Sequence, residues 1–207
     1  MYLSSRPLLL ISASTEFRYL NERRRLEPVD FPPSLRSSTF LHFCCSPSRS
    51  LVIQSQLSPP WAPALAFEPI PDRCVPAELP ALARIMPHLA VFSPNHEEAW
   101  AFFGKTPAEV KEMGRRGIEV VARKFVDEVG ARKDVVIRSG AMGAYALRTG
   151  QQGVWVPAYH TDVENVVDVT GAGNSFMVRA ALGWIPAKRA LTAPAGRIDG
   201  GPRATPG

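Results

Sequence analysis

The stretch Asp168-Val-Thr-Gly-Ala-Gly-Asn-Ser-Phe176 decides the fold of this 207-residue chain. Two glycines, Gly171 and Gly173, stand one residue apart and follow a strand that residues 163–167 predict. Glycines permit a sharp turn and a close approach of the backbone to a ligand. The next residues begin a helix, whose free N–H groups and positive dipole end attract anions. The segment therefore predicts a cradle for phosphate, although a lone Gly-x-Gly is more often a plain connecting turn.

Residues 168–176 resemble the C-terminal signature of the pfkB (ribokinase-like) carbohydrate kinase family, Asp-Thr-x-Gly-Ala-Gly-Asp-x-Phe. Val169 stands where the family has Thr. Asn174 stands where the family has Asp, the residue that serves as its catalytic base. The Asn form is similar to that of a fungal branch of the family, the branch that contains the killer-virus maintenance protein.

Three further segments resemble the family in the expected order along the chain. Residues 67–72 resemble a strand end, residues 93–98 resemble its Pro-Asn-x-x-Glu segment, and residues 136–143 resemble its Gly-x-x-Gly hairpin. The resemblance covers residues 64–177 and extends weakly back to about residue 38. It implies the C-terminal half of a longer fold, without the N-terminal half that builds most of the family's sugar site.

The alternation of elements along the middle of the chain predicts an α/β fold. Strands are expected at 39–44, 89–92, 134–138, 144–148 and 154–157, and helices at 49–57, 79–86, 96–103 and 116–129. Strand–helix–strand alternation with short connections is typical of a parallel sheet flanked by helices. With the resemblance, it predicts a partial ribokinase-like three-layer α/β/α sandwich with a mainly parallel sheet.

The resemblance implies ATP-dependent phosphorylation of a sugar-like hydroxyl group, with Mg²⁺ as the metal. The implied anion hole is Gly171, Ala172 and Gly173, the nucleotide-binding residues are Gly140, Gly143 and Thr170, and the metal site is Asn95 and Glu98. Magnesium takes few protein carboxylates and keeps several of its waters, so two polar residues suffice for such a site. The alternative for Glu97 and Glu98 is a solvated helix N-terminus, where acidic residues are favoured anyway.

The catalytic base separates two hypotheses about function. An amide at Asn174 has no useful basicity, and general acid–base catalysis typically contributes about 10²–10⁴-fold to a rate. Asp168 is the nearest alternative carboxylate in the sequence. The chain is therefore either a pfkB-type phosphotransferase impaired by truncation and by Asn174, or a non-catalytic nucleotide-binding pseudokinase or regulatory fragment.

Composition predicts three regions and limits the partners. Residues 1–37 are expected to be weakly ordered, residues 38–178 to form the partial kinase domain, and residues 179–207 to be a disordered Pro/Gly-rich basic tail. The net charge is +5, and residues 178–207 hold five Lys/Arg and one Asp. Those basic residues are scattered, with Trp184 as the only aromatic, which favours a solvated tail over a nucleic-acid site.

Cysteine usage and hydropathy favour a cytoplasmic location. Cys44, Cys45 and Cys74 form no Cys-x-x-Cys pair, so neither a zinc site nor a disulfide framework is indicated. No stretch approaches the roughly 18 apolar residues of a membrane span. The expected ligands are a nucleotide and a sugar-like small molecule, with neither nucleic acid nor a membrane as a partner.

Overall fold

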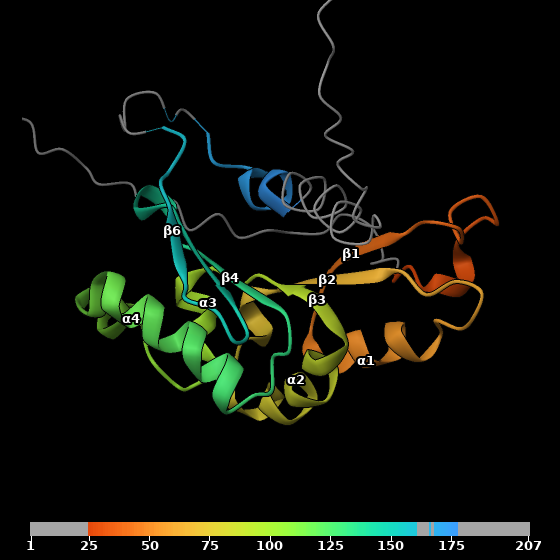
Figure 1. Cartoon of the computed structure of the whole chain (residues 1–207), viewed down its shortest axis with the longest axis horizontal. Coiled ribbons are helices and arrows are strands. Elements are labelled where there is room, and N and C mark those ends of the chain that lie inside the picture. The colour runs from red at the N-terminus through yellow and green to blue at the C-terminus, as the bar shows by residue number, and fades with distance from the viewer. Residues whose placement is uncertain (1–24, 161–165, 167, 178–207) are drawn as a thin grey trace, which may run out of the picture.

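The computed structural model describes residues 25–160, 166 and 168–177, and a six-stranded sheet organises them (Figure 1). The strands are β1 (Phe40–Cys45), β2 (Ala64–Pro69), β3 (Leu89–Phe92), β4 (Asp134–Arg138), β5 (Ala144–Arg148) and β6 (Val154–Val156). They lie side by side in chain order. Strands β1 to β4 are parallel, while β5 and β6 are antiparallel to their neighbours. The predicted α/β class with a mainly parallel sheet is confirmed.

Helical crossovers join the parallel strands. The helices are α1 (Pro47–Ser55), α2 (Leu79–Ile85), α3 (His96–Ala101) and α4 (Pro107–Asp127), and short 3₁₀ turns cover Pro28–Asp30, Pro71–Arg73, Pro76–Glu78, Met86–His88 and Gly140–Met142. Because such crossovers are right-handed and the strand order is sequential, successive helices must fall on the same face of the sheet. Figure 1 shows α1, α2 and α4 on one side of the sheet and the short helix of residues 172–177 on the other.

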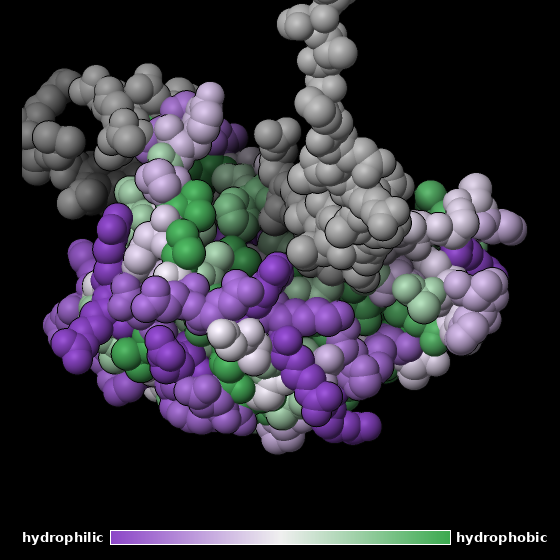
Figure 2. All heavy atoms as spheres, viewed as in Figure 1, coloured by the Kyte–Doolittle hydropathy of each residue, from purple (hydrophilic) through white to green (hydrophobic). Residues whose placement is uncertain are grey.

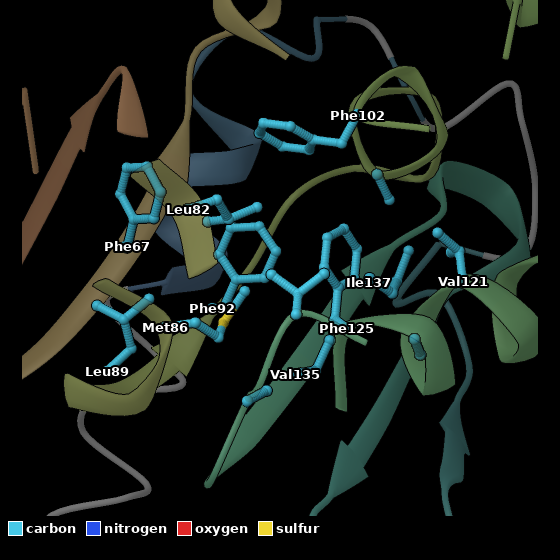
Figure 3. Close-up of a cluster of buried hydrophobic side chains, with 14 of the residues drawn as sticks. Phe67, Leu82, Met86, Leu89, Phe92, Phe102, Val121, Phe125, Val135 and Ile137 are labelled. Atoms are coloured by element: carbon cyan, nitrogen blue, oxygen red, sulfur yellow. The ribbon is translucent and has the colours of Figure 1, made fainter. Parts of the chain in front are cut away.

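The main core lies between the sheet and the helices (Figure 3). Phe67 of β2 and Phe92 of β3 have ring centroids 5.7 Å apart, and Phe92 meets Phe125 of α4 edge-on at 4.9 Å. All three side chains are fully buried. Strand residues alternate between the two faces of a sheet, so the neighbours of these core residues face the opposite side. There Met177 is buried in a second, smaller cluster with Ala66 and Val91.

Helix α4 shows how a local signal sets an element's boundary. Thr106 and Glu109 form a capping box, with Pro107 at the first helical position. Gly114, at φ 54°, interrupts the helix, so the separate helix predicted at 116–129 is the second part of α4. Its buried stripe packs on the sheet, and Figure 2 shows mainly hydrophilic side chains over its outer surface.

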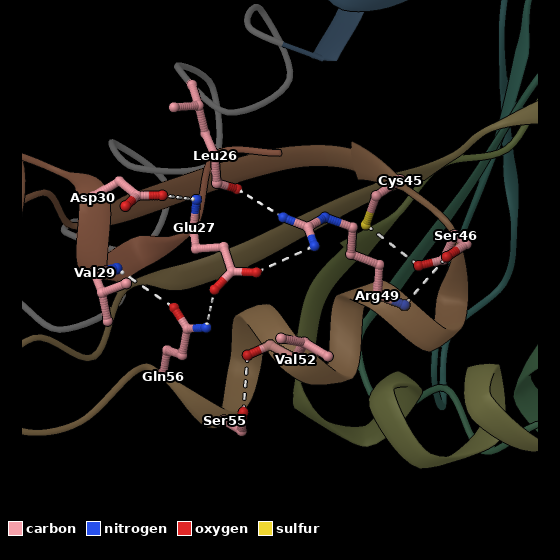
Figure 4. Close-up of polar contacts among 10 residues, drawn as sticks. All are labelled: Leu26, Glu27, Val29, Asp30, Cys45, Ser46, Arg49, Val52, Ser55 and Gln56. Carbon is pink, nitrogen blue, oxygen red and sulfur yellow. Dashed lines mark hydrogen bonds and ion pairs between the residues drawn. The ribbon is translucent and has the colours of Figure 1, made fainter. Parts of the chain in front are cut away.

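A polar network ties residues 26–30 to α1 (Figure 4). Glu27 accepts a hydrogen bond from Gln56 Nε2 at 2.6 Å, and its Oε1 lies 3.3 Å from Arg49 Nη1. Arg49 also donates to the carbonyl oxygen of Leu26 at 3.1 Å. These contacts fix the chain that enters β1. Most of the first predicted region, residues 1–24, and the whole predicted tail, 179–207, lie outside the described residues.

Several predicted elements coincide with the structure. The strands predicted at 89–92, 134–138 and 144–148 are β3, β4 and β5, and those predicted at 39–44 and 154–157 differ from β1 and β6 by one residue at their ends. Strand β2 was indicated only by the strand end within residues 67–72. The strand predicted at 163–167 lies outside the described residues except for Val166. In the part of the chain that the structure describes, no helix combines the length and apolar character needed to cross a membrane.

Candidate functional site

The carboxyl ends of the parallel strands bring charged side chains together on the sheet face opposite α1–α4. Glu68 stands next to the core residue Phe67 in β2, so its side chain points to the other face. By the same alternation His42 of β1 shares that face, and its Nε2 lies 3.3 Å from Glu68 Oε2. Arg138 ends β4, where ligands commonly bind in parallel α/β sheets.

Asn95 and Glu98 form the N-terminal cap of α3. The Asn95 side chain accepts the backbone N–H of Glu98 at 2.8 Å, and Glu98 Oε2 accepts the backbone N–H of Asn95 at 2.7 Å. This reciprocal pair is a capping box. It satisfies two N–H groups that a helix end would otherwise leave without partners. The two residues predicted as a metal site therefore lie together, and each is bonded to the other.

Arg138 connects this cap to the sheet. Its Nη2 lies 2.7 Å from Glu68 Oε1 and 3.5 Å from Glu98 Oε2. The same nitrogen donates to the carbonyl oxygen of Ser93 at 3.2 Å. Both carboxyl groups are buried, so the guanidinium lies beside two groups whose charged forms burial penalises. We name Glu68, Glu98 and Arg138 the Arg138 cluster.

Burial outweighs the attraction of Arg138 in setting the protonation of Glu98. Burial raises the pKa of the Glu98 carboxyl above its usual 4.5. The hydrogen bond from the Asn95 backbone and the charge of Arg138 act in the opposite direction, and Glu68 adds to the rise. A carboxyl with a raised pKa in a polar site is a common feature of functional sites.

The glycine turn of residues 171–173 packs against the Arg138 cluster. A Cβ atom at Gly173 would overlap Arg138 Nη1 and lie 2.9 Å from Glu68 Oε1. Gly171 has φ 77°, in the left-handed region that favours glycine, and a Cβ there would meet nothing within 4 Å. Gly171 therefore serves the shape of the turn, whereas Gly173 permits its close approach to the sheet.

Asp168 and Asn174 lie on either side of this turn, and both are exposed. Asp168 Oδ1 accepts the backbone N–H of Thr170 at 2.8 Å. This bond and a second one to the Thr170 side chain lower the pKa of Asp168, so the carboxylate is ionised at neutral pH. Asp168 and Thr170 thus hold the start of the turn.

Gly140 and Gly143 bound the 3₁₀ turn between β4 and β5. Gly143 has φ 93°, and a Cβ there would overlap the carbonyl oxygen of Val156 in β6. The close approach of β6 therefore leaves no room for a side chain at position 143. At Gly140, with φ 54°, a Cβ would meet nothing within 4 Å. Of these two glycines, Gly140 is the one with open space beside its backbone.

The structure brings only some of the predicted site residues together. Glu98 belongs to the Arg138 cluster, and Asn95 and Gly173 both contact it. Arg138 and Glu68 were not predicted as site residues, although both lie in segments that carry the family resemblance. The available signal was their position, since charged residues at the carboxyl ends of apolar parallel strands often face a ligand site.

The Arg138 cluster does not fit a directly bound Mg²⁺ ion. Glu98 Oε2 and the Asn95 side-chain oxygen already accept hydrogen bonds, and a cation beside Glu98 would face the Arg138 guanidinium. A metal carried by phosphates would reach these groups through its waters, which Mg²⁺ gives up reluctantly. Among the described residues, no three His, Cys, Asp or Glu side chains are arranged to hold a metal ion.

Two ribokinases and a putative sugar kinase are among the known proteins of similar fold. The chain superimposes on a ribokinase from Cryptococcus neoformans var. grubii in complex with ADP, with a TM-score of 0.57, 21% identity and coverage of 76% of this chain and 52% of the other. For a putative sugar kinase from Clostridium perfringens the TM-score is 0.52, the identity 17%, and the coverage 74% and 44%. For an Arabidopsis thaliana ribokinase complexed with ribose and ATP, the values are 0.50, 15%, 73% and 45%.

The sequence comparisons agree with the fold. An uncharacterised protein from Schizosaccharomyces pombe is 23% identical over 186 residues, which are 80% of this chain and 51% of that protein. The chain thus spans about half the length of the relatives it matches. The family model of the pfkB family carbohydrate kinases matches residues 64–186, more than half of the 207 residues. This chain belongs to the pfkB family of carbohydrate kinases.

Proposed function

We propose that the protein is an ATP-dependent phosphotransferase that acts on the hydroxyl group of a sugar-like molecule. The observation that carries the proposal is the packing of the Gly171–Gly173 turn against Arg138 and Glu68 at the carboxyl ends of the strands. Membership of the pfkB family supports it. So does the likeness in fold to ribokinases whose structures contain ATP with ribose, or ADP.

In this proposal the glycine turn holds the transferring phosphoryl group. The backbone N–H groups of Gly171, Ala172 and Gly173 are the proposed anion hole, and Arg138 lies directly behind Gly173. The N–H of Ala172 donates to the carbonyl oxygen of Val169 at 3.1 Å in this structure, so it would have to exchange that partner for a phosphate oxygen. Phosphoryl transfer depends mostly on positioning and on charge compensation, which such donors provide. Thr170, Gly140 and Gly143 are the proposed contacts to the nucleotide, with Gly140 offering the more open backbone.

Mg²⁺ is proposed to arrive with the phosphates of ATP. Magnesium usually keeps several waters and is bound through one or two carboxylates together with substrate phosphates. Asn95 and Glu98 are therefore proposed to meet its water shell rather than the ion itself. When bound, the metal would neutralise charge on the phosphates, while the protein groups orient them.

A second candidate function is binding without catalysis. It is favoured by Asn174, which occupies the family's base position with an amide that cannot take a proton from a substrate hydroxyl group. Asp168 is the proposed substitute base, although its carboxylate already holds Thr170. The Asn174 form also motivates the proposal that the chain belongs to the fungal branch that contains the killer-virus maintenance protein.

We extend the proposal to the domain organisation of the chain and to its cellular location. Residues 38–178 are proposed as the kinase-related domain, corresponding to the C-terminal half of the family fold, and the flanking segments as accessory. Cys44, Cys45 and Cys74 are free thiols, which suits a reducing cytoplasmic environment.

Transfer of the labelled γ-phosphate of ATP to a panel of pentoses, hexoses and nucleosides tests the proposal. The purified protein is assayed with Mg²⁺, and Gly173→Val serves as the matched variant. A labelled phosphorylated acceptor that forms with the wild type, but not with Gly173→Val, would support the phosphotransferase function. ATP binding without transfer to any acceptor supports the non-catalytic alternative, whereas neither binding nor transfer contradicts both.

A further inference from the structure

The Arg138 guanidinium is held in place from several directions. The backbone N–H of Arg138 donates to the carbonyl oxygen of Pro94 at 3.0 Å, and its Nη2 donates to that of Ser93 at 3.2 Å. Its side chain is 17% exposed, while the Glu68 and Glu98 side chains are 9% and 8% exposed. The positive charge is therefore fixed at one point beside two buried carboxylates.

Two buried carboxylates side by side require a cation or a proton, because like charges in a desolvated site oppose each other's ionisation. A divalent cation is one common solution, since oxygen ligands from acidic residues suit hard metal ions. Here the solution is a side chain of the same protein, with Nη2 of Arg138 at 2.7 Å from Glu68 and 3.5 Å from Glu98.

We propose that Arg138 is a built-in cation that takes the position of a divalent metal ion between Glu68 and Glu98. As a consequence, the protein binds no metal there by itself, and its affinity for nucleotide phosphates does not depend on a protein-bound metal. The cluster is thus a positioning device, since the same guanidinium supports the turn at Gly173. The part that concerns nucleotide rests on the proposed function, whereas the part that concerns the metal does not.

The ionisable groups around Arg138 are consistent with this role. His42 is the other basic side chain at the cluster, with Nε2 at 3.3 Å from Glu68 Oε2. Arg138 Nε is buried without a hydrogen-bond partner among the described residues. A guanidinium keeps its charge at every pH that a folded protein tolerates, so the built-in cation cannot be lost by deprotonation.

Mn²⁺ is the probe for the metal, since it prefers the same oxygen ligands as Mg²⁺ and its free form is measured by electron paramagnetic resonance. The full chain is titrated without nucleotide. We expect no bound Mn²⁺ in the wild type and about one equivalent in Arg138→Met, which removes the guanidinium and leaves two carboxylates, the usual number for such an ion. Arg138→Lys, which keeps the charge, and the double variant R138M/E98Q should not bind it.

Arg148→Met is the matched control, because Arg148 forms a comparable pair with Asp134, at 2.7 Å, on the neighbouring strand. It should bind no Mn²⁺. The inference would be overturned if the wild type bound one equivalent of Mn²⁺ and Glu98→Gln abolished that binding. This comparison does not depend on whether a variant of Arg138 folds. A folded Arg138→Met protein that fails to bind Mn²⁺ would overturn it as well.

Calorimetric titration with ADP separates this inference from the proposed function. Because Asn95 and Glu98 would contact a phosphate-bound Mg²⁺ only through its waters, we expect the Kd of the wild type for ADP to differ by less than about tenfold between EDTA and Mg²⁺, a change equivalent to about 1.4 kcal/mol. Binding that requires Mg²⁺ would overturn the inference and leave the proposed function standing. The absence of ADP binding under both conditions would count against the proposed function, and the Mn²⁺ result would then decide the inference.

Discussion

The backbone of Gly173 rests directly on the guanidinium of Arg138. A Cβ atom at position 173 would overlap Arg138 Nη1 and approach Glu68 Oε1 to 2.9 Å. The two residues are 35 positions apart in the sequence, and the ends of β2 and β4 bring the ion pair under the turn. The turn that would bind phosphate and the charges that would support it therefore form one unit.

Asn174→Asp should increase the rate of phosphoryl transfer. The new carboxylate would lie in the first turn of the helix of residues 172–177, where negative charge is favoured, so it would be ionised at neutral pH. We expect a gain of at least about tenfold, within the range that general bases supply. Steady-state assays with ATP and the best acceptor measure it. Asn174→Ser is the control, and an unchanged rate despite ATP binding would show that another defect limits turnover.

Glu98→Gln should change how stability depends on pH. Because burial raises the pKa of Glu98 above 4.5, the folded state holds this proton more tightly than the unfolded chain. The stability that Glu98 contributes is present below pH 4.5 and is lost as the pH rises through the folded-state pKa. The free energy of unfolding of the wild type, relative to Glu98→Gln, should fall over this window and then level off.

Urea denaturation at a series of pH values measures this difference. Glu97→Gln, at an exposed residue one position earlier in the same helical turn, is the control for removal of a nearby charge. A difference that rises with pH would mean that Arg138, rather than burial, dominates the environment of Glu98.

Phe125→Ala should be strongly destabilising. The ring of Phe125 is fully buried and meets Phe92 at 4.9 Å, Phe103 at 5.4 Å and Phe102 at 6.2 Å. Removing such a ring typically costs about 3–5 kcal/mol. Val120→Ala, on the exposed side of the same helix, should cost less than about 0.5 kcal/mol. A loss of under about 1 kcal/mol for Phe125→Ala in urea denaturation would contradict the packing of α4 on the sheet.

Much of the fold could be predicted from the sequence because its signals are local. The strand at 89–92 is a short apolar run, preceded by Pro87 and followed by Pro94, and it is β3 as predicted. Thr106, Pro107 and Glu109 specify the start of α4 through groups within four residues of each other. The kink within α4 depends on one residue, Gly114, and its effect on the helix required the structure.

The candidate site was harder to predict because one pattern fits two structures. Asn95-x-x-Glu98 matches the family's metal segment, but it is also a capping box, and the structure shows that the cap is formed. Arg138 and Glu68 meet only through the strand order, which no local spacing reveals. Gly143 was predicted to contact the nucleotide, whereas its contact with β6 is a tertiary constraint.

Calorimetric titration of the wild type and of Gly173→Val with ATP and Mg²⁺ tests the central claim most directly. The control is Gly150→Ala, at a hairpin glycine with φ 79° where a Cβ would meet nothing within 4 Å. We predict that the wild type and the control bind ATP alike, and that Gly173→Val binds it at least about tenfold more weakly, a loss of about 1.4 kcal/mol or more. Equal affinity of a folded Gly173→Val protein would contradict the assignment of the 171–173 turn to the phosphate site.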